Sequence, residues 1–136
     1  MTGPASFYDG PRYCSAVLAK LYLGAYFTTF RLALATTPLF GSNFFLRRTA
    51  WLPVADTVHR SGLKVHDDLD LTIRLTPSHH IAYDPANRVE ISFRPFQQPQ
   101  TFGLRMVRGL ATLAKNWPRS SSTLRWRRKL LNLLCA

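Results

Sequence analysis

A long apolar stretch near the start of the chain most limits what it can fold into. It runs from Ser15 to Thr37, contains no proline, and carries two charges, Lys20 and Arg31. As a helix it would extend about 35 Å, which covers the ~30 Å hydrocarbon core of a bilayer. Each charge lies near one end of the stretch, within reach of a membrane interface. The stretch therefore predicts a helix over 13–37, with a single transmembrane span as the favoured interpretation.

The two charges share one face of this predicted helix, because they are about three turns apart. Small residues accompany them at helical spacing, and small residues allow neighbouring helices to approach closely. We interpret this face as a packing interface, formed by Ala16, Lys20, Gly24, Thr28, Arg31 and Ala35. Two other interpretations remain: a core helix of a water-soluble protein with this face at its surface, and a secretory signal with Ala33–Ala35 as the cleavage site.

The charge balance is strongly basic. The 136 residues include 18 Lys and Arg against 7 Asp and Glu, for a net charge of +11. Six of the seven acidic residues lie in 56–90, whereas 10–55 and 91–136 contain none. Such a chain favours anionic partners: nucleic acid, anionic lipid or acidic protein surfaces. The arginine-rich, acid-poor composition is also typical of organelle-targeted chains, which favours the mitochondrion.

Composition and periodicity divide the chain into five segments. They are an extended lead-in (1–12), the apolar helix (13–37), an aromatic and basic loop (38–62), a small antiparallel β meander (63–94) and basic amphipathic helices (95–136). In the loop, Arg47 and Arg48 lie close to Trp51, which is typical of a membrane interface. The same pair would place this side of the span in the matrix by the positive-inside rule.

The central segment follows a strand pattern. Residues 69–75 alternate strictly between apolar and polar side chains, which predicts a strand with one buried face. Residues 81–94 predict a hairpin around a turn at Asp84–Asn87. Three antiparallel strands would form a small sheet that needs a helix or another subunit to cover its apolar face. The predicted fold class is therefore α+β.

Two basic helices are predicted near the end of the chain, over 101–117 and 124–136. Each helix has an apolar side and a basic side. These sides are Phe102, Met106, Leu110 and Leu113 against Arg105, Arg108 and Lys115 in the first, and Leu124, Leu130, Leu131 and Leu134 against Arg125, Arg128 and Lys129 in the second. Such a helix can lie on anionic lipid or contact acidic subunits, and alternatively it can follow RNA phosphates. The expected contact residues are Arg47, Arg48, Arg119, Arg125, Arg127, Arg128 and Lys129, with Trp51 and Trp126 as interface aromatics.

No catalytic signature accompanies these features. The candidate metal ligands are His66, Asp67, Asp68, Asp70, His79 and His80. On a strand His79 and His80 would point to opposite faces, which argues against one shared ion. There is no glycine-rich phosphate loop, no nucleophile elbow and no paired cysteine motif. We expect no enzyme activity, metal, cofactor or small-molecule substrate.

Together these patterns predict a non-catalytic accessory subunit of a multi-subunit complex in the mitochondrial inner membrane, such as a respiratory chain complex or the ATP synthase. The predicted partners are other subunits and anionic phospholipid such as cardiolipin. The alternative is a small basic RNA-associated protein, for example of an organellar ribosome.

Overall fold

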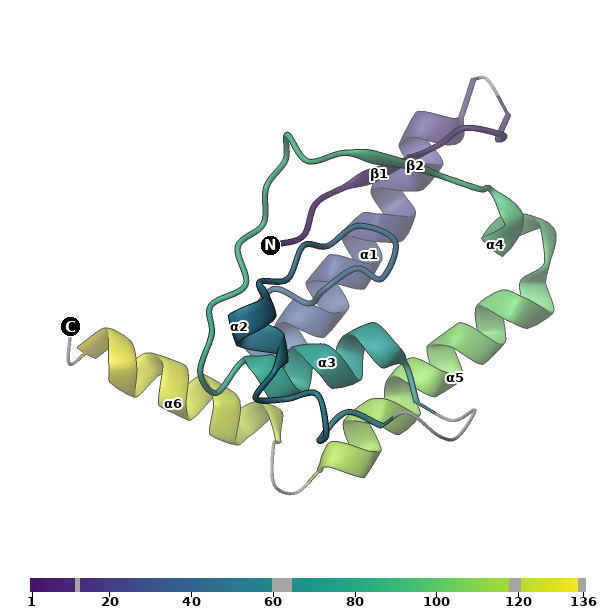
Figure 1. Cartoon of the computed structure of the whole chain (residues 1–136). Coiled ribbons are helices and arrows are strands. Elements are labelled where there is room, and N and C mark those ends of the chain that lie inside the picture. The colour runs from purple at the N-terminus through teal and green to yellow at the C-terminus, as the bar shows by residue number, and fades with distance from the viewer. Residues whose placement is uncertain (12, 60–64, 118–120, 135–136) are drawn as a thin grey trace.

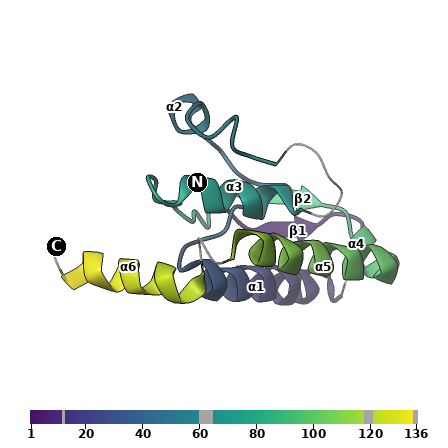
Figure 2. The same ribbon diagram turned by 90° about the horizontal axis from the view of Figure 1, so that it is seen from below.

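The structure is a computed structural model that describes residues 1–11, 13–59, 65–117 and 121–134. This part of the chain combines helices with one two-stranded parallel sheet. In chain order the elements are β1 (Ala5–Phe7), α1 (Ser15–Leu34), α2 (Arg48–Trp51), α3 (Asp67–Leu75), β2 (Val89–Ile91), α4 (Arg94–Gln97), α5 (Pro99–Asn116) and α6 (Ser122–Leu134). Figure 1 shows the chain from one side. In Figure 2, α1, α5 and α6 form one layer, α3 and the strand pair stack on it, and α2 lies beyond α3.

The apolar stretch forms α1, but the helix is shorter than predicted. It ends at Leu34 because Ala35 adopts a left-handed conformation, with φ of 56° and ψ of 18°. Among the helices of the described ranges, none is both long and apolar enough to cross a membrane, so the predicted transmembrane span is wrong. One side of α1 packs on its own chain through Ala19, Leu23, Phe30 and Leu34.

The predicted strand at 69–75 is also wrong, because this segment forms most of α3. Three aspartates lie in the first turn of α3, where free N–H groups and the helix dipole favour negative charge. Of the three polar residues that a strand would have turned to solvent, Asp70 and Thr72 are buried and Arg74 is half-buried. Thr72, for example, is fully buried, and its hydroxyl accepts a 2.9 Å hydrogen bond from the Leu39 N–H.

The strands that do form contradict the predicted antiparallel meander. β1 and β2 run parallel, with Ala5 opposite Val89 and Phe7 opposite Ile91. The partner of β2 therefore comes from the start of the chain and not from the preceding segment at 81–83. Each strand has only three residues, so the sheet depends on what packs around it.

Thr2 explains why the predicted hairpin does not pair with itself. The Thr2 N–H donates to the Ala82 carbonyl, and the Asp84 N–H donates to the Thr2 carbonyl, both at 2.9 Å. The backbone groups that a hairpin would use are thus occupied by the N-terminus. The turn predicted at Asp84–Asn87 is present, and the Ala86 N–H donates to the Asp84 carboxylate at 2.9 Å.

α3 is the centre of the hydrophobic core, because it supplies residues to two clusters. The first lies between α1 and α3, and its buried members are Phe30, Leu34, Leu69 and Ile73. The second lies between α3 and the segment that includes α2, and its buried members are Leu39, Ala50, Leu71, Leu75 and Ile81.

The close approach of α5 to the first cluster gives a prediction about two glycines. A Cβ at Gly109 would lie 2.9 Å from Phe30 Cζ and 3.5 Å from Leu69 Cδ1, both in buried side chains. Overpacking costs about 1–3 kcal/mol, which exceeds the ~1 kcal/mol that removing a helical glycine contributes. At Gly103, in the same helix, a Cβ meets nothing within 4 Å.

We therefore expect Gly109→Ala to lower the free energy of unfolding by about 1 kcal/mol. Gly103→Ala should raise it by about 0.5–1 kcal/mol. Chemical denaturation followed by circular dichroism measures both variants. If both variants change the free energy of unfolding in the same direction, the packing of α5 described above is incorrect.

Candidate docking surface

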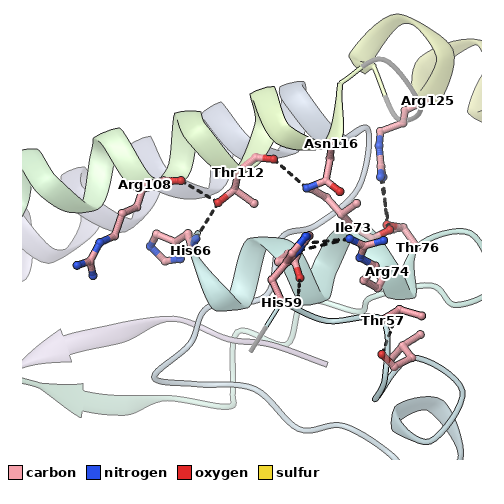
Figure 3. Close-up of polar contacts among 12 residues, drawn as sticks. Thr57, His59, His66, Ile73, Arg74, Thr76, Arg108, Thr112, Asn116 and Arg125 are labelled. Carbon is pink, nitrogen blue, oxygen red and sulfur yellow. Dashed lines mark hydrogen bonds and ion pairs between the residues drawn. The ribbon is translucent and has the colours of Figure 1, made fainter. Parts of the chain in front are cut away.

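The first half of α6 is fixed to the ends of two core helices. The Trp126 indole N–H donates to the Leu32 carbonyl of α1 at 2.7 Å. The Arg125 guanidinium donates to the Thr76 hydroxyl at 3.1 Å and to the Ile73 carbonyl of α3 at 3.5 Å, as Figure 3 shows in part. A cation at the C-terminus of a helix is favourable because carbonyl groups there lack intrahelical partners. Burial, with Arg128 nearby as a smaller cause, lowers the pKa of Arg125.

The second half of α6 extends beyond the rest of the described chain (Figure 1). No residue of α6 is buried in this part of the structure. Its leucines are between 40% and 83% exposed: Leu124, Leu130, Leu131, Leu133 and Leu134. Three exposed basic residues accompany them: Arg127, Arg128 and Lys129. We call these eight residues the α6 surface.

The α6 surface is both apolar and cationic. Large leucines of a single folded chain are rarely left exposed together unless another molecule covers them. The basic residues beside them favour an anionic covering surface. Trp126 already has two contacts within the chain. Its indole N–H donates to α1, and the Lys129 ammonium lies 5.1 Å from the ring centroid.

The predicted packing face of α1 lies mostly at the surface. Ala16, Lys20, Gly24, Thr28 and Arg31 are exposed, whereas Ala35 is buried after the end of the helix. A Cβ at Gly24 would meet nothing within 4 Å, so no other part of the described chain covers the face at this position. Val17, Leu21 and Leu32 lie beside it and are between 57% and 64% exposed.

The other predicted contact residues are not brought to the α6 surface. Arg47 and Arg48 are exposed at the start of α2, on the opposite side of α3 from α6 (Figure 2). Trp51 packs against the second core cluster and does not form an exposed interface aromatic. Arg119 lies outside the described residues.

Two buried polar clusters on α3 were not predicted. In the first, Asp70 is 1% exposed and accepts hydrogen bonds of 2.9 Å from both the backbone N–H and the ring of His59. The Arg74 guanidinium lies 3.7 Å from the same carboxylate. The spacing of Asp70 and Arg74 by four residues indicates a helical ion pair, and it is the signal that the strand interpretation missed.

The second cluster surrounds Asp68. Its carboxylate accepts hydrogen bonds from the Gly41 N–H at 2.7 Å and the Leu69 N–H at 3.0 Å, and it contacts the His66 ring. The Tyr26 hydroxyl lies 3.4 Å from it and donates to the Leu39 carbonyl at 2.6 Å. Burial raises the pKa of Tyr26, and the Asp68 charge adds to the effect. This hydroxyl therefore stays protonated.

The candidate metal ligands are divided between different environments. Asp68 and Asp70 belong to the two separate clusters, and His79 and His80 are exposed after α3. Over the residues that the structure describes, no group of three or more His, Cys, Asp or Glu could hold a metal ion.

No family model matches the chain, and no curated protein and no solved structure is detectably similar to it. The function is therefore inferred from the surface and the internal geometry of the molecule.

Proposed function

We propose that this protein is a non-catalytic accessory subunit that attaches peripherally to an anionic membrane surface through α6. The observation that carries the proposal is the α6 surface, where exposed leucines and three basic residues share a helix that extends from the body. An amphipathic helix of this kind lies in the membrane interface with its apolar side in the acyl boundary. Its basic residues are attracted to anionic headgroups.

The exposed leucines favour lipid over RNA as the binding partner of the α6 surface. Binding to single-stranded RNA uses basic residues together with aromatic rings on which bases stack. The aromatic residue of α6 is Trp126, whose N–H is bonded to Leu32 and whose ring lies near Lys129. Leucines contribute little to binding phosphates, whereas insertion into an acyl boundary buries them.

The exposed face of α1 supports membership of a larger assembly. It offers small residues for close helix packing and two cations, Lys20 and Arg31, for acidic partners. The Arg31 guanidinium also donates to the Thr37 hydroxyl at 2.9 Å, which holds it at the end of α1. The arginine-rich composition supports the mitochondrial inner membrane, where cardiolipin would be the anionic lipid.

Sedimentation with vesicles tests the proposal. We expect the protein to bind vesicles that contain cardiolipin, and to bind neutral phosphatidylcholine vesicles much more weakly. Neutralising Arg127, Arg128 and Lys129 with glutamine should weaken binding about 100-fold, because each basic residue contributes about 1 kcal/mol at an anionic surface. A matched control replaces three exposed arginines away from α6, Arg47, Arg48 and Arg88, with glutamine.

The control variant should bind within a few-fold of the unmodified protein. Equal losses in both triple variants would mean that only net charge matters and that α6 has no special role. Replacing Leu130 and Leu134 with serine separates lipid from RNA, because it should weaken vesicle binding and leave RNA binding unchanged. RNA binding that is tighter than vesicle binding, and insensitive to these leucines, would contradict the proposal.

A further inference from the structure

A large cavity lies between α1 and α5, where the first turn of α3 and the segment 40–44 meet them. Its volume is about 790 Å³, and α1 provides much of its wall. The exposure of Leu21 and Ala25 at its edge shows that it opens to solvent. We propose that this cavity binds an anionic amphiphile with a single hydrocarbon chain, and that Arg108 binds its carboxylate or phosphate headgroup.

The walls suit a hydrocarbon chain. α1 contributes Leu18, Tyr22 and Phe30, and the opposite sides contribute Phe44, Leu71 and Met106. Pockets that hold small ligands range from about 300 to 1,000 Å³ and are mostly apolar with a few placed polar groups. This cavity fits that description, and its charged residues come from α3 and α5.

Two carboxylates line the cavity: Asp67 is exposed, and the buried one, Asp68, is already satisfied by its own chain. Asp68 accepts hydrogen bonds from the Gly41 and Leu69 N–H groups and contacts the His66 ring. The backbone N–H of His66 donates to the Thr112 hydroxyl at 2.7 Å (Figure 3). These contacts compensate the negative charge of Asp68, so it does not serve as the partner of Arg108.

Arg108 is the group in this cavity that still needs a partner. Its Nε is buried and has no hydrogen-bond acceptor among the described residues. Its side chain leaves α5 beside the His66 ring (Figure 3), while its backbone carbonyl accepts from Thr112 at 2.7 Å. A buried donor without an acceptor is costly, and the guanidinium group is suited to bind carboxylate and phosphate.

A second cation lies at the same edge. Arg105 is three residues before Arg108 on α5, lines the cavity, and is exposed. Residues three apart on a helix are neighbours, so both guanidinium groups would be within reach of one headgroup. An anionic group here would supply the missing acceptor for Arg108, while its chain would cover the aromatic wall. This binding goes beyond the proposed membrane attachment and does not depend on it.

Calorimetry with three probes of equal chain length tests the inference: dodecanoate, dodecyl phosphate and the uncharged 1-dodecanol. We expect one molecule of either anion to bind per chain, about tenfold more tightly than the alcohol. Tighter binding of dodecanoate or of dodecyl phosphate identifies the preferred headgroup. Arg108→Gln should weaken both anions about tenfold and leave the alcohol unchanged. Arg127→Gln, which removes the same charge from α6, should change none of the three affinities.

A further variant keeps the test decisive if Arg108→Gln fails to fold. Ala25→Trp places a large ring at the opening of the cavity beside α1 and should abolish binding of all three probes, while circular dichroism confirms the fold. The inference is overturned if the unmodified protein binds neither anion, if Arg108→Gln folds and binds them unchanged, or if Ala25→Trp retains binding. Vesicle binding by the same samples reports separately on α6, so failure of one proposal is distinguishable from failure of the other.

Discussion

Replacing Asp70 with alanine should lower the free energy of unfolding by about 3 kcal/mol. The carboxylate is almost fully buried and holds the backbone and ring of His59, with Arg74 close by. Removing it leaves the His59 N–H without its acceptor and Arg74 without its nearby negative charge. His59 and Arg74 are partly exposed, so water can replace some of the hydrogen bonds that they lose. The expected loss of stability is therefore at the lower end of the range of about 3–5 kcal/mol for breaking a buried ion pair.

Urea denaturation at neutral pH measures this effect, with Asp67→Ala as the control. Asp67 is exposed in the same first turn of α3, so its removal should cost only about 0.5 kcal/mol through the helix dipole. A loss for Asp70→Ala no greater than that of Asp67→Ala would show that the contacts with His59 do not stabilise the fold.

Replacing Leu69 with alanine should have a similarly large effect, a loss of about 3 kcal/mol. Leu69 is 0% exposed and belongs to the cluster between α1 and α3. Truncation removes apolar contacts and leaves a cavity that the surrounding helices fill only in part. Leu110→Ala is the matched control on α5, because Leu110 is 59% exposed and should change stability by less than about 0.5 kcal/mol. Equal losses for the two variants would contradict the central position of α3.

α3 shows why periodicity misled the prediction. A strand pattern assumes that alternating polar residues face water, but here Asp68, Asp70 and Thr72 face the interior. Each one bonds a backbone group from another segment, so polarity in this stretch does not indicate exposure. The three aspartates of the first turn were a helix signal that the alternation concealed. The bonds to His59, Gly41 and Leu39 come from distant segments and could not be predicted locally.

The helices near both ends were predictable because their hydrophobic patterns are long. α1, α5 and α6 lie within or close to their predicted ranges. The basic and apolar sides of α6 also follow from the sequence, and they form the candidate docking surface. The inward contacts of Arg125 and Trp126 do not, because they depend on where α1 and α3 end. The cavity beside Arg108 likewise requires the relative positions of elements far apart in the chain.

The pairing of β1 with β2 has a consequence for how the protein is made. Asp9 accepts a hydrogen bond from the Ser92 hydroxyl, which lies 83 residues later in the chain. During translation, β1 therefore has no partner until about 83 further residues have been synthesised. Contacts of such long range slow folding and leave apolar residues such as Phe7 uncovered in the meantime. We expect the nascent chain to need protection by chaperones until β2 leaves the ribosome.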